Sequence, residues 1–212
     1  MRLLVFTRTT GYRHDSIPAG LAALRDFAPD LHASEDPEVF VRPLEWDAIV
    51  FLNTSGDVLT DAGRAALERY VTAGGGFAGI HCAAATETGW PFYQSLIGAR
   101  FTGHPEIQPG RILVADADHP ATAGLPDPWP RVEEWYDFEA QATDRVLLRA
   151  DTTSYQGSTL PGDHPLAWCH QRHGGRAFYT ALGHGADAYA EPLLRAHLRG
   201  GIAWAAGATS SP

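Results

Sequence analysis

The chain has 212 residues, of which 44% are hydrophobic and 19% are charged, a balance typical of one globular domain. Its formal net charge of −9 argues against a nucleic-acid partner, because a protein that follows a phosphate backbone needs a basic surface. No apolar run approaches the roughly 18 residues of a membrane helix, and the short apolar start does not resemble a signal peptide, so we expect no membrane partner and a cytoplasmic location.

The first half of the chain alternates short apolar runs with amphipathic segments. The runs typical of buried parallel strands are residues 3–7, 31–34, 46–52 and 77–80. Between them, Ser16 can cap one helix, and Thr60 can cap a second helix that ends at the glycines of 74–76. The chain then turns at His81.

The second half is less regular. Further strands are expected at 111–114, 145–148, 166–170 and 176–180, the last two joined by a hairpin turn at 173–175, and a helix at 192–205. No linker is visible, so we expect one domain over 1–207 and a disordered tail over 208–212. Strands that alternate with helices predict an α/β fold: a flavodoxin-like open, mostly parallel sheet with helices on both faces and an added β-hairpin.

Three histidine-bearing loops follow predicted strands. His14 follows the first strand, His81 follows the glycine-rich strand at 77–80, and His184 follows the strand at 176–180. Because ligands of open α/β sheets gather at the carboxyl ends of the strands, we expect these side chains to meet in space. The other histidines are expected in packing or on the surface, except His104, which we treat as a candidate contact.

The segment from Gly74 to Cys82 resembles the strand and sharp turn that present the nucleophile in class I glutamine amidotransferases. That family places cysteine directly after a Gly-Ile pair, whereas here His81 takes this position and Cys82 follows it. Such a turn projects one side chain over the pocket, so Cys82 is expected to be a buried structural cysteine. Glutaminase activity requires a thiolate at the tip, and it is therefore not expected.

A closer resemblance covers nearly the whole chain and points to the trehalose-utilisation, or ThuA-like, family. Its motifs are GYRH (11–14), GGFAGIH (75–81), WPFY (90–93), HP (104–105), DHP (118–120), EEWY (133–136), HPLAW (164–168), GRAFYTALGH (175–184) and GGIAW (200–204). The resemblance implies work on disaccharides such as trehalose or on their oxidised forms. A sugar or keto-sugar is therefore the expected partner, and the sequence leaves a homo-oligomer open.

The segment at 133–137 supplies acids and aromatic residues. Side chains of an extended segment alternate between two faces, so Glu134 and Tyr136 should share one face, which we expect to be that of the pocket. The candidate catalytic residues are His81, Glu134 and His184. The candidate substrate-binding residues are Tyr12, His14, Asp15, His104, Tyr136, Trp135 and Tyr155.

Histidines grouped with a carboxylate suit proton transfer or a divalent metal. His81, His104 and His184, together with Glu134, would form a ligand set for Zn²⁺ or a similar ion, although no H-x-x-x-H spacing supports it. The chain contains no lysine, which excludes a Schiff-base lysine and a Walker-type lysine, and we expect no nucleotide cofactor.

The leading hypothesis is a carbohydrate-processing enzyme that acts on a disaccharide or keto-glycoside by acid–base lyase or hydrolase chemistry, with or without a metal. A ketone acidifies the neighbouring C–H, a base such as Glu134 or His81 removes that proton, and elimination expels the aglycone. The alternative is a non-catalytic sugar-binding or complex-forming subunit on the same fold. A third reading, a structural protein with unrelated histidines, would be favoured if His14, His81 and His184 lay far apart.

Overall fold

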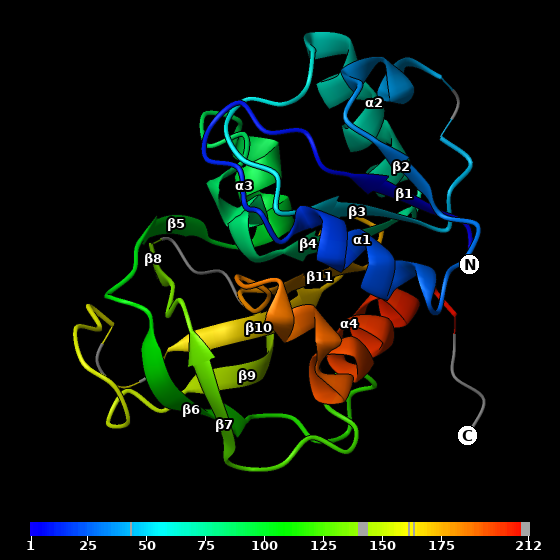
Figure 1. Cartoon of the computed structure of the whole chain (residues 1–212). Coiled ribbons are helices and arrows are strands. Elements are labelled where there is room, and N and C mark those ends of the chain that lie inside the picture. Colours follow the sequence, from blue (N-terminus) through cyan, green and yellow to red (C-terminus); the bar gives the residue numbers. More distant parts are fainter. Residues whose placement is uncertain (43, 140–143, 161, 163, 209–212) are drawn as a thin grey trace.

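A nine-stranded mixed sheet runs through the computed structural model, which describes residues 1–42, 44–139, 144–160, 162 and 164–208 (Figure 1). Its strand order is β2-β1-β3-β4-β11-β10-β9-β6-β7, and β5 pairs with β8 in a separate small sheet. The strands are β1 (Leu3–Phe6), β2 (His32–Ser34), β3 (Ala48–Leu52), β4 (Gly76–Ile80), β5 (Arg100–Gly103), β6 (Gln108–Val114), β7 (Trp129–Glu133), β8 (Asp137–Glu139), β9 (Arg145–Ala150), β10 (Pro165–His170) and β11 (Ala177–Thr180). The helices are α1 (Ile17–Arg25), α2 (Asp61–Thr72), α3 (Pro91–Ile97) and α4 (Pro192–Ala205), with 3-10 turns η1 (Pro37–Val41), η2 (His81–Ala85) and η3 (Asp187–Ala190).

The parallel part of the main sheet consists of β2, β1, β3, β4 and β11. Every residue of β1, β3, β4 and β11 is buried, as expected for strands covered by helices on both faces. The α/β fold class expected from the sequence is therefore confirmed, and the carboxyl ends of these strands share one edge of the sheet.

The antiparallel part is larger than the single hairpin that the sequence predicted. The hairpin itself is present as β10 and β11, with Gly174 of its turn at φ +94°. The sheet then continues through β9, β6 and β7, all antiparallel. The strands β5, β7 and β8 and the helix α3 were not predicted. In β7, Pro130 weakens the strand pattern, and proline is tolerated because β7 lies at the edge of the sheet.

The helices cover the two faces of the sheet in pairs, α1 beside α4 on one face and α2 and α3 on the other (Figure 1). Consecutive side chains of β3 point to opposite faces of the sheet. The ring of Phe51 stacks on Tyr93 of α3, whereas Leu52 lies against Gly20 of α1. Within the described part of the chain, no helix has both the length and the apolar character that crossing a membrane requires.

The two predicted helix caps have different outcomes. Thr60 caps α2, with its Oγ1 accepting a hydrogen bond from the Gly63 amide at 3.1 Å, as predicted. The prediction for Ser16 was wrong, because Ser16 occupies the N-cap position of α1 but its side chain makes no cap bond. Its hydroxyl instead accepts a hydrogen bond from Asn53 Nδ2 at 3.0 Å, so tertiary contact displaces local capping here. Of the expected tail, residues 209–212 lie outside the described residues.

Candidate functional site

His14, His81 and His184 meet at the carboxyl edge of the parallel strands. They follow β1, β4 and β11, and the sheet brings these strand ends to one side of the molecule. The centroid of the His14 ring lies 4.7 Å from that of His81 and 5.3 Å from that of His184, and the last two centroids are 5.4 Å apart. The structure therefore brings together the three histidines that the sequence singled out, and this geometry disfavours the reading in which they are unrelated.

A strained backbone presents His81. Its φ of +51° is unusual for a residue with a side chain, and such outliers persist where the surrounding structure holds them. Tyr179 fixes the turn, because its hydroxyl donates to the His81 carbonyl at 2.8 Å. The next residue, Cys82, is buried at 5% exposure, and burial raises the pKa of its thiol to about 11. A thiolate nucleophile is therefore disfavoured at neutral pH.

Glu134 reaches the same point from the connection between β7 and β8. Its Oε2 lies 3.0 Å from His81 Nε2, 2.9 Å from His184 Nδ1 and 3.8 Å from His14 Nε2. Its other oxygen, Oε1, lies 2.9 Å from His104 Nε2. Burial alone would raise the pKa of this carboxyl, but the contacts with the imidazoles outweigh burial and hold the pKa well below its usual range.

The protonation of His81 follows from its contacts. Nδ1 donates to the carbonyl of Ala181 at 2.6 Å, so Nδ1 carries the proton and Nε2 of the neutral ring carries a lone pair. Burial is the main reason that the pKa of His81 falls to about 4, so the ring is neutral near pH 7. Its lone pair therefore faces the ionised Glu134 oxygen at 3.0 Å, an arrangement that is repulsive unless a cation lies between them.

We call His14, His81, Glu134 and His184 the cluster. One side-chain atom from each lies within 4.8 Å of the others. In a tetrahedral zinc site, Zn–N bonds of about 2.0–2.1 Å place the ligand atoms roughly 3.3 Å apart. His184 Nδ1 lies 2.9 Å from Glu134 Oε2, and this contact with the carboxylate raises the pKa of His184 above its usual value. Three imidazole nitrogens and one carboxylate oxygen that converge in this way could hold a divalent cation. The donor set of imidazole and carboxylate suits Zn²⁺ or a similar ion.

The expected ligand set and the cluster differ at one member, since His14 takes the position expected for His104. His104 touches the outer oxygen of Glu134, and its Nδ1 donates to the Pro105 carbonyl at 2.8 Å. Its side chain is 34% exposed, against 25% for His184 and 4% for His14. His104 therefore lies at the solvent side of Glu134, where a small molecule can reach it.

Tyr136 shares the face of Glu134, as the alternation predicted. Its hydroxyl lies 2.9 Å from His81 Nε2, and burial raises its pKa well above the usual value, so the phenol stays protonated. Tyr12 is 69% exposed and lies edge-on to His14, with ring centroids 4.8 Å apart, and Asp15 is exposed on the same loop. Tyr12 therefore lies at the rim of the cluster.

Trp135 and Tyr155 are not brought to the cluster. Their rings stack on each other with centroids 4.7 Å apart, and Trp135 Nε1 donates to the carbonyl of Gln108. The Tyr155 hydroxyl donates to Nδ1 of the buried His164. Trp135 faces away from Glu134 and Tyr136 because neighbouring residues in an extended segment point to opposite sides. The aromatic pair therefore packs under β6.

Asn53, at the end of β3, was not singled out from the sequence. Its side-chain amide donates to Ser16 Oγ at 3.0 Å and towards the carbonyl of Gly183 at 3.4 Å, and its backbone amide donates to the carbonyl of Ile80 at 3.3 Å. It thus contacts the segments that carry His14, His184 and His81. The sequence carried one signal that could have identified Asn53, because it is a polar residue directly after a buried strand.

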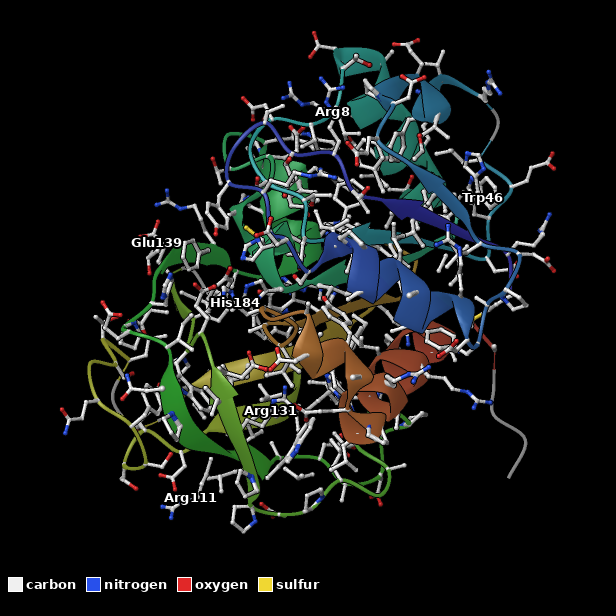
Figure 2. All side chains as sticks on the ribbon, in the orientation of Figure 1. Arg8, Trp46, Arg111, Arg131, Glu139 and His184 are labelled. Atoms are coloured by element: carbon white, nitrogen blue, oxygen red, sulfur yellow. The ribbon has the colours of Figure 1, made fainter. Side chains whose placement is uncertain are left out.

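The surface beside His184 is hollowed into a recess of about 560 Å³. His184, Gly185 and Glu133, the neighbour of Glu134, are among the residues that line it. Figure 2 labels His184 and Arg131, which lie on this side of the molecule. A molecule bound in the recess would therefore lie next to the cluster.

Comparisons with known proteins give a family and a fold. The family model ThuA, described as trehalose utilisation, matches residues 2–205. A protein from Bacteroides uniformis described as ThuA-like has a TM-score of 0.80 at 23% identity, covering 97% of this chain and 91% of its own. One from Parabacteroides merdae with the same description has a TM-score of 0.81 at 19% identity, covering 100% and 92%.

A more distant similarity reaches beyond proteins described as ThuA-like. A Thermoplasma acidophilum protein described as a GMP synthase component has a TM-score of 0.60 at 15% identity, covering 97% of this chain and 94% of its own. At this identity the likeness shows a shared fold alone. Among curated proteins, none matches the chain.

Proposed function

Because this chain belongs to the ThuA family, described as trehalose utilisation, we propose that it processes a disaccharide or keto-glycoside by metal-assisted acid–base chemistry at the cluster. Family membership supports a carbohydrate-related role. The observation that carries the chemical part is the 3.0 Å contact between the lone pair of neutral His81 and the ionised Glu134. Two acceptors held this close in a buried site favour a cation between them.

Nε2 of His14, Nε2 of His81, Nδ1 of His184 and Oε2 of Glu134 would hold the ion. When bound, a divalent cation polarises the carbonyl oxygen of a keto-sugar and stabilises the negative charge of an enolate. The Ala181 carbonyl keeps the lone pair of His81 directed at the site, as carbonyl partners of ligating histidines do. The cluster residues would thus hold the cation at the place where the substrate carbonyl has to bind.

Since Glu134 and His81 serve as ligands in this arrangement, proton transfer falls to a group at the rim. His104 suits it best, because it is the more exposed imidazole in contact with Glu134 and imidazole is the side chain that exchanges protons most readily near neutral pH. In the proposed elimination, His104 removes the proton next to the ketone, and the electron pair forms the enolate. The C–O bond to the aglycone then breaks, and the departing oxygen takes a proton from the imidazolium or from water.

The test uses purified protein that has been stripped with a chelator and then reloaded with Zn²⁺. We expect 3-keto-trehalose to be cleaved by the loaded protein and not by the stripped protein, and plain trehalose to react much more slowly because its C–H is not acidified. His104→Ala should lower turnover at least tenfold while the zinc content stays the same, whereas His81→Ala should lose zinc. Cleavage that is unaffected by chelation would contradict the metal-assisted part.

A direct readout of the ion is independent of turnover. Crystals soaked in zinc should give an anomalous signal in contact with His14, His81, His184 and Glu134. Protein that binds sugar, gives no cleavage and gives no such signal would instead support the non-catalytic sugar-binding role.

A further inference from the structure

The recess beside His184 has a wall of charged groups that the cluster does not use. Its lining comes from β6, β7 and η3 with their neighbouring loops: Ile107, Pro109, Gly110, Pro130, Arg131, Val132, Glu133, His184, Gly185, Asp187, Ala188 and Glu191. A volume of about 560 Å³ falls in the range of small-molecule sites. Because His184 belongs to both, the recess lies beside the cluster.

The guanidinium of Arg131 already has hydrogen-bond partners within the wall of the recess. Its side chain is only 1% exposed and donates to Glu133 Oε1 at 3.0 and 2.8 Å and to Glu191 Oε2 at 2.6 Å. It also lies 4.7 Å from the ring centre of Trp129. With two carboxylates and an aromatic face around it, this arginine cannot also serve as the binding group for an anionic ligand.

The remaining charge of the recess is negative. Glu133, Asp187 and Glu191 are three carboxylates against the single guanidinium of Arg131, and a protonated His184 would still leave an excess of negative charge. Glu191 is half exposed and Asp187 is exposed, so both offer carboxylate oxygens to a ligand. Next to them, Ile107 and Val132 are 49% and 62% exposed and form an apolar surface.

We infer that this recess is the subsite for the part of the substrate that departs, and that it selects an uncharged, hydroxyl-bearing group over a phosphorylated or carboxylated one. Carboxylates accept hydrogen bonds from hydroxyl groups and repel phosphate. The apolar surface of Ile107 and Val132 suits the C–H face of a sugar ring. This inference rests on the proposed function, because it places the reacting part of the sugar at the cluster.

The experiment compares binding of trehalose and trehalose 6-phosphate to the zinc-loaded protein by isothermal titration calorimetry. We expect the neutral sugar to bind at least tenfold more tightly. In the double variant Asp187→Asn, Glu191→Gln this preference should fall at least threefold, because two negative charges leave the recess. The control double variant Glu45→Gln, Glu68→Gln removes the same charge from exposed positions outside the recess and should keep the wild-type ratio.

The results of this experiment distinguish failure of the proposed subsite from failure of the proposed reaction. Equal binding of the two sugars, or a ratio that the recess variant does not change, overturns the subsite even if keto-sugar is cleaved. Selective binding of the neutral sugar without any cleavage supports the subsite and contradicts the proposed reaction. If neither sugar binds and none reacts, both fail.

Discussion

Glu134 shows how one carboxylate organises a site whose other members are imidazoles. A buried carboxylate is costly unless it is paired, and here its partners are rings that share it from three loops. Its low pKa is the result of those partners opposing the effect of burial. Under the proposed function, the Oε2 oxygen of Glu134 and the three imidazole nitrogens would face a shared metal ion.

Replacement of Glu134 by glutamine tests this interpretation. We expect Zn²⁺ affinity, measured by chelator competition, to fall at least about tenfold, because the amide oxygen is a far weaker ligand. In the wild type, zinc at 100 times its Kd should add about 2.7 kcal/mol to the free energy of unfolding. At the same zinc concentration, a variant whose Kd is ten times higher should gain only about 1.4 kcal/mol.

The matched control is Glu139→Gln, which alters an exposed ion pair with Arg100 and should keep the zinc response. If Glu134→Gln lowers stability equally with and without zinc, Glu134 is a structural ion-pair partner and not a ligand.

Asn53 positions the cluster indirectly, because it hydrogen-bonds the segments that carry His14, His81 and His184. Asn53→Asp is nearly isosteric and tolerates the φ of +49°, but it replaces the Nδ2 donor with an acceptor that faces Ser16 Oγ and the Gly183 carbonyl. We expect a loss of at least about 1–3 kcal/mol in the free energy of unfolding, because a buried acceptor is left unpaired and a carboxylate costs more than a neutral group. We also expect a severalfold weaker affinity for zinc.

Ser16→Ala removes one of the two acceptors and should have a smaller effect in both measurements. A purely structural role for Asn53 would lower stability and leave the zinc affinity unchanged, so chelator competition decides between the two roles.

At the scale of elements, close contact of α4 with the sheet explains one glycine of the 74–76 run. A Cβ on Gly76, the first residue of β4, would lie 2.3 Å from the backbone carbonyl oxygen of Ala205 at the end of α4. Gly76→Ala must therefore move the helix or the strand, since backbone atoms cannot rotate away. We expect a loss of about 1–3 kcal/mol in the free energy of unfolding, measured by urea denaturation.

Gly89→Ala is the control for this helix–sheet contact, because no atom lies within 4 Å of its added Cβ and its φ is ordinary. It should leave the free energy of unfolding within about 0.5 kcal/mol of the wild type. A Gly76→Ala protein as stable as Gly89→Ala would show that α4 is not held at this distance.

The connection between β7 and β8 is the element that completes the site. β7 ends at the edge of the main sheet, whereas β8 pairs with β5 in the small sheet, so the residues between them pass over the strand ends. Alternation within this connection places Glu134 and Tyr136 on the cluster side and Trp135 on the other. The alternation of side chains could be predicted from the sequence, whereas the path of this connection over the strand ends could not.

At the scale of the whole molecule, buried neutral histidines make stability depend on pH. His197 is fully buried, its Nδ1 donates to the Ala121 carbonyl, and its Nε2 accepts from Thr180. Burial lowers its pKa from 6.5 to about 4, so the unfolded chain binds a proton that the folded chain does not. This stabilisation is complete above pH 6.5 and is lost as the pH falls towards 4, at about 1.4 kcal/mol per pH unit.

Urea denaturation at pH 7.5, 6 and 5, in chelator, checks this prediction. We expect His197→Gln to be less stable at pH 7.5 but to lose less stability on acidification than the wild type. His32→Gln, at an exposed position, should keep the wild-type slope. Parallel pH dependences for the wild type and His197→Gln would mean that His197 does not titrate on unfolding.

The sequence by itself determined the α/β fold class, the main parallel strands, the cap at Thr60 and the three histidine loops, because each depends on patterns within about ten residues. It also determined that Glu134 and Tyr136 share a face. Only the tertiary structure decided that His14 joins the cluster while His104 lies outside it, that Trp135 stacks on Tyr155, and that Asn53 ties the loops together. These contacts join residues far apart in the chain, such as His81 with Glu134 and with His14, 53 and 67 positions apart. Their distances depend on how the edge of the sheet and the small β5–β8 sheet pack, for which no local pattern exists.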